Sequence, residues 1–368
     1  MEILHLTLKD FRNYETADVT FDGGLNIVVG PNGHGKTNLL EAVHVMATMS
    51  SHRSATVGPM VRFDADTAII RAQGKARARS VSVDAEIRRT GGVRVLVNKV
   101  PIERAEAASV ISAVLFSPED LNLTKGGPEE RRRFLDQTCV KLRPLSGAER
   151  QEFERVLKQR NGVLKAATSN PRAVKHLEVW TEQLIKTGSV VARNRLELLS
   201  RITGPIQRRH GEVAATGQPV TLGYEASWVQ GAPPMSLDGI SVSLRTAVEA
   251  SLPRDIERGL SLVGPHRDDI AIRLDDVDAR TYASQGEQRS LALAMRLAER
   301  DILTEENGEE PILLLDDVFS ELDEFRRSHL AELVEVAGQT IATTTSDEGL
   351  GLAGRRLAVD SGKVVPLE

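Results

Sequence analysis

One stretch near the start of the chain has the residue types and spacing of a phosphate-binding loop. Residues 30–37 read Gly-Pro-Asn-Gly-His-Gly-Lys-Thr, which fits the Walker A pattern in full. Glycines let backbone N–H groups close around phosphate oxygens, and a helix starting at the loop adds partial positive charge. In this pattern the lysine bridges the β- and γ-phosphates and the threonine binds Mg²⁺. The sequence therefore predicts an ATP site formed by Gly30, Pro31, Asn32, Gly33, His34, Gly35, Lys36 and Thr37.

Much later in the chain, an apolar run ends in two carboxylates. Residues 312–315 are Ile-Leu-Leu-Leu, and Asp316 and Asp317 follow directly. A buried strand can deliver a carboxylate to a metal ion or to an attacking water at its C-terminal end. We therefore predict that Asp316 binds Mg²⁺ together with Thr37, and that Asp317 polarises the water. With Lys36, these two aspartates are the predicted catalytic residues.

A third element, Ser284-Gln-Gly-Glu-Gln-Arg289, opens a helix between these two motifs. A serine in this place can simply cap a helix. The triple of Ser284, Gly286 and Gln288, however, is typical of ATPases that complete their site across a dimer. Hydroxyl and backbone donors at a helix N-terminus suit a γ-phosphate. We predict that these three residues contact ATP held by a second copy, so that ATP would join two copies into a homodimer.

The elements that must position these residues come from both ends of the chain. Strand patterns occupy residues 4–8, 19–21 and 25–29, and a helix with apolar positions on one side follows Thr37. Residues 68–102 alternate as an antiparallel sheet with a hairpin turn at 90–92. Further strands are predicted at 220–228, 260–274, 312–315 and 339–344, with helices after Ser284 and through Leu330 and Leu333.

The middle of the chain has helical patterns. We expect one helix from Pro128 to Pro144, a second opened by a capping box of Ser146 and Glu149, and a third from Asn170-Pro171 to just before Gly204-Pro205. These helices are too short for long coiled-coil arms. The predicted fold is α/β: an ABC-type P-loop ATPase head made from residues 1–119 and 259–368, with a mostly helical, basic subdomain inserted at 120–258.

Charge is unevenly distributed. The chain has a net charge of −5, yet residues 120–210 contain 19 Lys and Arg against 10 Asp and Glu. Residues 71–104 contain nine basic and three acidic residues. Solvated helix and strand faces can explain such runs, but segregation on this scale favours a polyanion such as DNA. Aromatic residues make up only 4%, so phosphate contacts should dominate over base stacking and should weaken with salt.

Several further segments of the sequence match motifs of one protein family. The chain resembles the RecF family of recombination-repair ATPases, which is related to ABC and SMC ATPases. The resemblance rests on residues 8–14, 30–38, 115–121, 127–136, 264–269, 284–289 and 315–323, of which Pro-x-x-Arg-Arg-x-Phe-Leu-Asp and Gly-Pro-His-Arg are the most specific. It implies an ATP-dependent dimer that binds single-stranded, gapped and possibly duplex DNA. It also implies that the protein acts with RecO and RecR to promote RecA loading and SOS induction. It places Arg12, Asn13 and Asn38 beside the nucleotide.

Two departures from the ABC pattern bear on turnover. Asp317 stands where ABC ATPases usually carry a glutamate, and Thr345 stands where a switch histidine is expected. We therefore expect a slow, DNA-stimulated ATPase that serves as a switch. Cys139 is the only cysteine, and the N-terminus has no signal-peptide pattern, so we expect a cytoplasmic protein without a membrane partner.

Three alternatives stay open at this point. The first is the nucleotide-binding subunit of an ABC transporter, although the roughly 250 residues between Lys36 and Ser284 argue against it. The second is a nuclease coupled to an SMC-like ATPase, for which few residues remain after Asp317. The third is a structural, SMC-like chromosome-binding ATPase in which hydrolysis is irrelevant.

Overall fold

The chain folds into two compact units, each assembled from separate segments. The structure is a computed structural model that describes residues 1–368 except 55, 169–170, 215–216, 322–323, 347–351 and 368. Unit 1 comprises residues 1–120, 209–217 and 292–368, and unit 2 comprises residues 121–208 and 218–291. Both chain ends build unit 1, as the motifs predict. The division falls at residue 291 and not at the predicted 258, because a small sheet and a short helix of residues 269–282 belong to unit 2.

Unit 1 contains a mostly parallel sheet that carries the predicted ATP motifs. Its strand order is β15-β14-β3-β13-β12-β8, and only the edge strand β15 is antiparallel to its neighbour. Four of these strands are almost wholly buried, which explains their unbroken apolar runs. The strands are β3 (Leu25–Val29), β8 (Ala113–Phe116), β12 (Ile312–Asp316), β13 (Thr340–Thr344), β14 (Arg355–Asp360) and β15 (Lys363–Leu367).

A second sheet of unit 1 is antiparallel, with the order β2-β1-β4-β5-β6-β7. Its alternating residues bury one face, including Leu6, Leu8, Ile70 and Val83, in the same core as helix α1. The predicted hairpin at residues 90–92 is confirmed between β5 and β6. The strands are β1 (Glu2–Phe11), β2 (Tyr14–Thr20), β4 (Thr67–Ala76), β5 (Arg79–Arg88), β6 (Val93–Val97) and β7 (Val100–Ile102).

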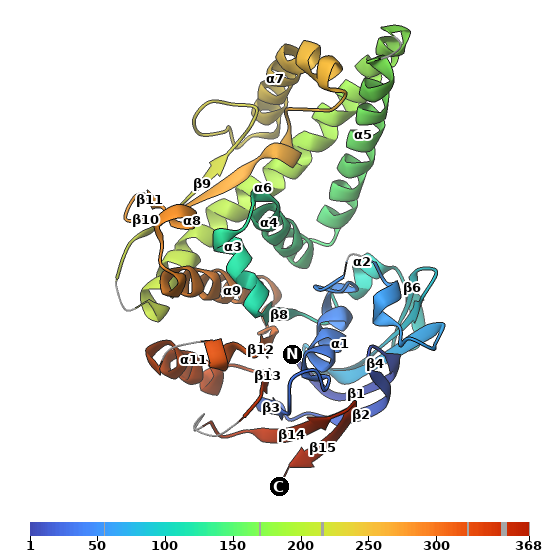
Figure 1. Ribbon diagram of the computed structural model, residues 1–368, viewed down its shortest axis with the longest axis vertical. Helices are drawn as coiled ribbons and strands as arrows, with labels where there is room; N and C mark the ends of the chain where they lie inside the picture. The colour runs from blue at the N-terminus through green and yellow to red at the C-terminus, as the bar shows by residue number, and fades with distance from the viewer. Residues whose placement is uncertain (55, 169–170, 215–216, 322–323, 347–351, 368) are drawn as a thin grey trace. The chain divides into compact units, whose positions relative to one another are not determined.

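In unit 1, helix α1 lies between the two sheets, whereas α9 and α11 pack against the other face of the core sheet (Figure 1). The longest, α9, begins in unit 2 and continues into unit 1. The helices of this unit are α1 (Lys36–Thr48), η1 (Gly58–Met60), α2 (Arg104–Ala107), η2 (Pro118–Leu121), α9 (Gln285–Asn307), α10 (Val318–Glu321) and α11 (Glu324–Val336).

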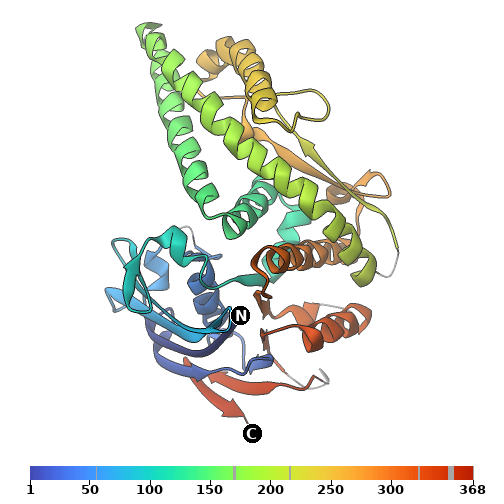
Figure 2. The same ribbon diagram turned by 180° about the vertical axis from the view of Figure 1, so that it is seen from behind.

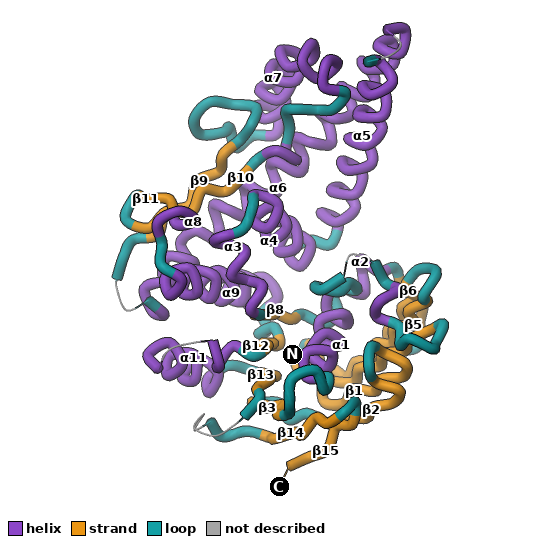
Figure 3. The backbone as a smooth tube through the Cα atoms, viewed as in Figure 1, coloured by secondary structure: helices purple, strands orange, loops and turns teal. Residues whose placement is uncertain are grey.

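Unit 2 is mostly helical, as Figure 3 shows. Helices α5 and α6 meet at one end and diverge toward the other in both Figure 1 and Figure 2, and α7 joins them through a core that includes Phe153, Leu184 and Val248. A three-stranded sheet of order β11-β10-β9 completes the unit. The elements are α3 (Asn122–Lys125), α4 (Pro128–Leu142), α5 (Leu145–Ala167), η3 (Pro171–His176), α6 (Leu177–Val213), β9 (Val220–Glu225), α7 (Leu237–Arg258), η4 (Pro265–Arg267), β10 (Asp269–Leu274), β11 (Val277–Asp278) and α8 (Ala279–Tyr282).

Two local predictions for this unit are wrong. Helix α6 continues through Gly204-Pro205 to Val213, because Ile202 and Ile206 on either side of the proline are fully buried and their packing outweighs the lost hydrogen bond. Ser146 lies inside α5, which begins at Leu145 without a side-chain cap. Its predicted partner Glu149 accepts hydrogen bonds from Arg143 and Asn194 instead.

The structure also differs from the prediction at the start of the third helix and along the predicted strand 260–274. Asn170 lies outside the described residues, and α6 begins only at Leu177, after the turn η3. The predicted strand 260–274 is shortened to β10, because residues 264–267 form a tight turn. In the part of the chain that the structure describes, no helix is both long and apolar enough to span a membrane.

Candidate functional site

The loop between β3 and α1 has the backbone shape that phosphate binding requires. Gly33 and Gly35 have φ angles of 81° and 121°, which are unfavourable for residues with a side chain. A Cβ atom on Gly30 would lie 2.2 Å from the carbonyl oxygen of Val359 in β14. The backbone conformation thus favours glycine at positions 33 and 35, and the close approach of β14 requires glycine at position 30.

Residues of the β1–β2 turn hold this loop from outside. Asn13 Nδ2 donates to the His34 carbonyl at 2.9 Å, and Asn38 Nδ2 donates to Asn13 Oδ1 at 2.8 Å. The Tyr14 hydroxyl donates to the Gly35 carbonyl at 2.9 Å. Asn13 and Asn38 thus lie beside the loop. Tyr14 was not predicted, and burial raises the pKa of its hydroxyl, which keeps it a neutral donor.

Arg12 binds a carboxylate of the helix that follows the loop. Its Nε donates to the carboxylate of Glu41 in α1 at 2.8 Å, and its Nη1 donates to the Pro59 carbonyl at 2.8 Å. Glu41 is completely buried, and although burial alone would raise its pKa, hydrogen bonds from Arg12 and Ser51 lower it. Arg12 therefore neutralises a buried carboxylate of the helix that follows the loop.

Lys36 is folded over its own loop. Its Nζ donates to the Gly30 carbonyl at 2.7 Å and the Pro31 carbonyl at 3.1 Å, and lies 3.4 Å from Asn32 Oδ1. Burial lowers the pKa of this ammonium group, while Asp317 and Asp316 act in the opposite direction. The lysine is thus held at the loop, close to the carboxylates of β12.

Asp316 and Thr37 meet as predicted. Thr37 Oγ1 donates to Asp316 Oδ1 at 3.0 Å, and Thr343 Oγ1 of β13 donates to the same oxygen at 2.7 Å. The main chain of Asp317 has a φ of 52°, and its N–H donates to Thr343 Oγ1 at 2.9 Å. Thr343 was not predicted; it lies on the buried strand β13, two residues before Thr345.

The residues present fit a bound Mg²⁺ ion. Mg²⁺ is usually held by one or two carboxylates, a hydroxyl, phosphate oxygens and water. Thr37 and Asp316 supply the hydroxyl and one carboxylate within hydrogen-bond distance of each other, and Asp317 Oδ1 is buried without a partner among the described residues. No group of three or more His, Cys, Asp or Glu side chains able to hold a metal occurs among these residues. The phosphates would therefore have to complete the shell, and the ion would neutralise their charge.

The Ser284 element lies in unit 2 and forms a capping box. The Ser284 N–H donates to Glu287 Oε2 at 2.7 Å, and the Glu287 N–H donates to Ser284 Oγ at 3.3 Å. Ser284 is exposed and Gly286 is half-buried, whereas Gln288 is buried with its Nε2 3.4 Å from the Ala279 carbonyl. Ser284 and Gly286 are thus accessible at the start of α9, and Gln288 supports the short helix α8.

Several basic residues of unit 2 are used inside the unit. Arg131 makes two 2.8 Å bonds to Asp269, and Arg132 donates to the Asp268 carbonyl. Arg195 makes a similar double contact with Asp136. These contacts argue against a row of DNA-binding arginines at 131–133.

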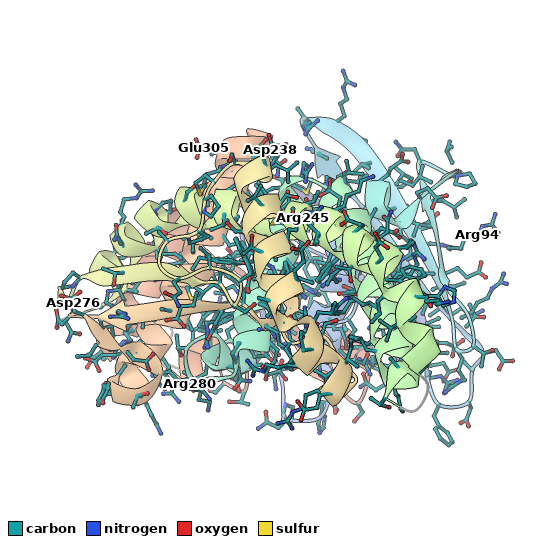
Figure 4. All side chains as sticks on the ribbon, turned by 90° about the horizontal axis from the view of Figure 1, so that it is seen from above. Arg94, Asp238, Arg245, Asp276, Arg280 and Glu305 are labelled. Carbon is teal, nitrogen blue, oxygen red and sulfur yellow. The ribbon has the colours of Figure 1, made fainter. Side chains whose placement is uncertain are left out.

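Further arginines differ in exposure. Arg245 of α7 pairs with Glu182 of α6 at the surface (Figure 4). Arg160 and Asp255 form a fully buried pair. Arg94 on β6 is exposed and points away from the molecule in Figure 4. The number of Lys and Arg residues in the sequence therefore overstates the positive charge that unit 2 can offer to a ligand, because several of these arginines are already paired with acidic side chains.

Comparison with known proteins decides the family. Residues 2–362 match the model of the RecF/RecN/SMC N-terminal domain. The DNA replication and repair protein RecF of Streptomyces avermitilis is 40% identical over 99% of both chains, and that of Frankia alni is 41% identical over the same shares. The chain belongs to the RecF family. The family prediction made from the sequence is thereby confirmed.

Solved structures of RecF agree with this assignment over the whole chain. The recombination mediator protein RecF-ATPrS superimposes with a TM-score of 0.93 at 28% identity, covering 100% of this chain and 98% of that one. RecF-ATP gives a TM-score of 0.91 at 28% identity. An SMC head at 17% identity has a TM-score of 0.57, which shows the shared fold alone. The predicted fold class, an ATPase head with a helical insertion, is confirmed, and the transporter and nuclease alternatives lose their support.

Proposed function

We propose that this RecF-family chain is an ATP-driven switch in DNA replication and repair. In its ATP state it forms a homodimer, binds single-stranded or gapped DNA, and acts with RecO and RecR to promote RecA loading. Slow hydrolysis of ATP then releases the two subunits. The supporting observation is the pairing of the loop 30–37 with Asp316, through Thr37, in a site suited to a Mg-nucleotide.

The proposal assigns a role to each predicted residue. The loop and Lys36 bind the phosphates, Thr37 and Asp316 hold Mg²⁺, and Asp317 orients the attacking water. Asn13 and Asn38 fix the loop, whereas Gln288 acts by supporting α8, the short helix just before α9. Ser284 and Gly286 contact the γ-phosphate held by the other subunit, and their placement at the start of α9, exposed for Ser284 and half-buried for Gly286, supports this role.

The test is sedimentation with a non-hydrolysable ATP analogue. Lys36→Met should lose both nucleotide binding and the dimer, because it removes the phosphate-binding charge. Ser284→Arg should keep ATP binding in the monomer but lose the dimer and the ATP-stimulated binding of gapped DNA. A matched control is Ser236→Arg, since exposed Ser236 caps α7 in the same way, accepting from the Gly239 N–H at 3.1 Å.

Each outcome has a clear meaning. A Ser284→Arg protein that dimerises like Ser236→Arg would refute the contact between subunits. Footprinting on gapped, single-stranded and duplex DNA, with and without ATP, then identifies the DNA substrate. Loss of ATP dependence on every substrate would refute the switch.

A further inference from the structure

The His34 carbonyl is gripped from outside the loop by two donors. The Gly362 N–H donates to it at 3.1 Å and Asn13 Nδ2 donates at 2.9 Å. In a trans peptide the C=O and the next N–H point in opposite directions. Since the carbonyl is turned outward, the Gly35 N–H is turned to the inner side of the loop, where backbone donors bind phosphate oxygens.

The His34 side chain reaches the same turn as its carbonyl. Its Nδ1 lies 2.8 Å from Asp360 Oδ1, and the Ser361 hydroxyl donates to that oxygen at 2.9 Å. Residues 360–362 connect β14 to β15, near the end of the chain. His34 is thus attached to this turn through both its main chain and its imidazole.

The turn also fits closely against Asn13 and against the start of the loop. Gly362 has a φ of 78°, and a Cβ atom there would lie 2.8 Å from the Asn13 carbonyl oxygen. Val359, just before the turn, leaves no room for a side chain on Gly30. The C-terminal hairpin therefore contacts the loop at its first residue and at its fifth.

We propose that the turn 360–362 positions the loop for phosphate binding, with His34 and Asp360 as positioning residues. This rests on the proposed binding of ATP by residues 30–37. Without the Asp360 carboxylate, the His34 imidazole is left with the 3.3 Å contact between the Ser361 N–H and its Nδ1, and the Gly35 N–H samples more orientations. Neither side chain touches the nucleotide. Since the loop donors serve phosphates that ATP and ADP share, both nucleotides should weaken by the same factor.

The experiment measures binding of ADP and of a non-hydrolysable ATP analogue to the full chain by calorimetry. Asp360→Ala should weaken both about 3- to 10-fold, the factor expected for one lost hydrogen bond. Asp360→Asn keeps an acceptor for His34 and should stay within about twofold of the wild type. His34→Ala combined with Asp360→Ala should weaken binding no more than either change alone, because both remove one contact.

The chain contains a matched control in the same unit. His5 and Asp18 form a second pair between histidine and aspartate, on β1 and β2. The histidine side chains are 35% and 34% exposed in the two pairs, and the aspartates 70% and 80%. Asp18→Ala should leave both affinities unchanged, since this pair does not contact the loop.

Four results would overturn the proposal. Asp360→Ala could bind both nucleotides as Asp18→Ala does, which leaves the proposed function intact. The ATP analogue alone could weaken, which would place the effect at the γ-phosphate. Asp360→Asn could melt normally yet bind as weakly as Asp360→Ala, so that the hydrogen bond would not matter. If the wild type bound neither nucleotide, the proposed function would fail as well.

Discussion

The substitution Arg131→Ala tests whether Arg131 stabilises unit 2 through Asp269 or contacts a DNA phosphate. Arg131 lies almost entirely inside unit 2, with 5% of its side chain exposed, and makes two bonds of 2.8 Å to Asp269 and one of 3.0 Å to the Gly126 carbonyl. Breaking a buried pair costs about 3–5 kcal/mol. Asp269 keeps 22% of its side chain exposed, so we expect about 2–4 kcal/mol for Arg131→Ala.

This loss is large enough to measure by differential scanning calorimetry. For a domain of this size each kcal/mol lowers the melting temperature by about 2–4 °C, so Arg131→Ala should lower that of unit 2 by about 4–16 °C. Its affinity for DNA should keep the wild-type dependence on salt. Arg133 provides the control: its side chain is 57% exposed and pairs at the surface with Glu130, so Arg133→Ala should change the melting temperature little.

The contrary result is equally clear. Suppose Arg131→Ala melted like the wild type and the slope of log K against log[salt] became shallower by about 0.7–0.9. Arg131 would then contact a phosphate, and the structural role inferred from Asp269 would be refuted.

Two further predictions concern turnover and pH. The wild-type protein should hydrolyse ATP at or below ~1 s⁻¹ without a partner. Asp317→Glu should raise this rate, because the longer side chain brings the carboxylate closer to the attacking water. A faster wild type, or a variant slower than the wild type, in a steady-state assay would contradict this. Burial lowers the pKa of His266 to about 4, below the ~6.5 of an unfolded histidine, so the folded state binds this proton less tightly. The free energy of unfolding should therefore rise between about pH 4 and pH 6.5, by up to roughly 3 kcal/mol. His266→Gln should remove that rise when the free energy of unfolding is measured by denaturant titration at each pH. If the free energy of unfolding depended on pH equally in both proteins, the prediction would be wrong.

The parts of the fold that could be predicted are those written in short, local patterns. The loop 30–37 and the strand ending at Asp316 combine residue types whose spacing already dictates their chemistry. The hairpin at residues 90–92 follows from strict alternation on both sides of two glycines. Each of these depends on neighbours within about ten residues, so no tertiary information is needed.

What could not be predicted depends on partners far apart in the sequence. Arg131 looks like a surface residue until Asp269 is placed beside it, 138 residues later. The contact between His34 and Asp360, 326 residues apart, could not be predicted, because no sequence motif around either residue indicates its partner. Strand β8 and the hairpin β14–β15 were missed for the same reason, since they are defined by the strands they pair with.

The position of β3 in the core sheet has a consequence for the synthesis of the protein. Its two neighbours, β13 and β14, leave the ribosome more than 300 residues after it. At about 5–20 residues per second this is a wait of roughly 15–60 s. Throughout that interval an apolar strand has both edges unpaired, which is a hazard for aggregation. The residues of unit 2 are complete by position 291, so a chain interrupted near residue 300 would have a full helical unit but an unfinished sheet. Such fragments should depend on chaperones and should be unable to hold nucleotide.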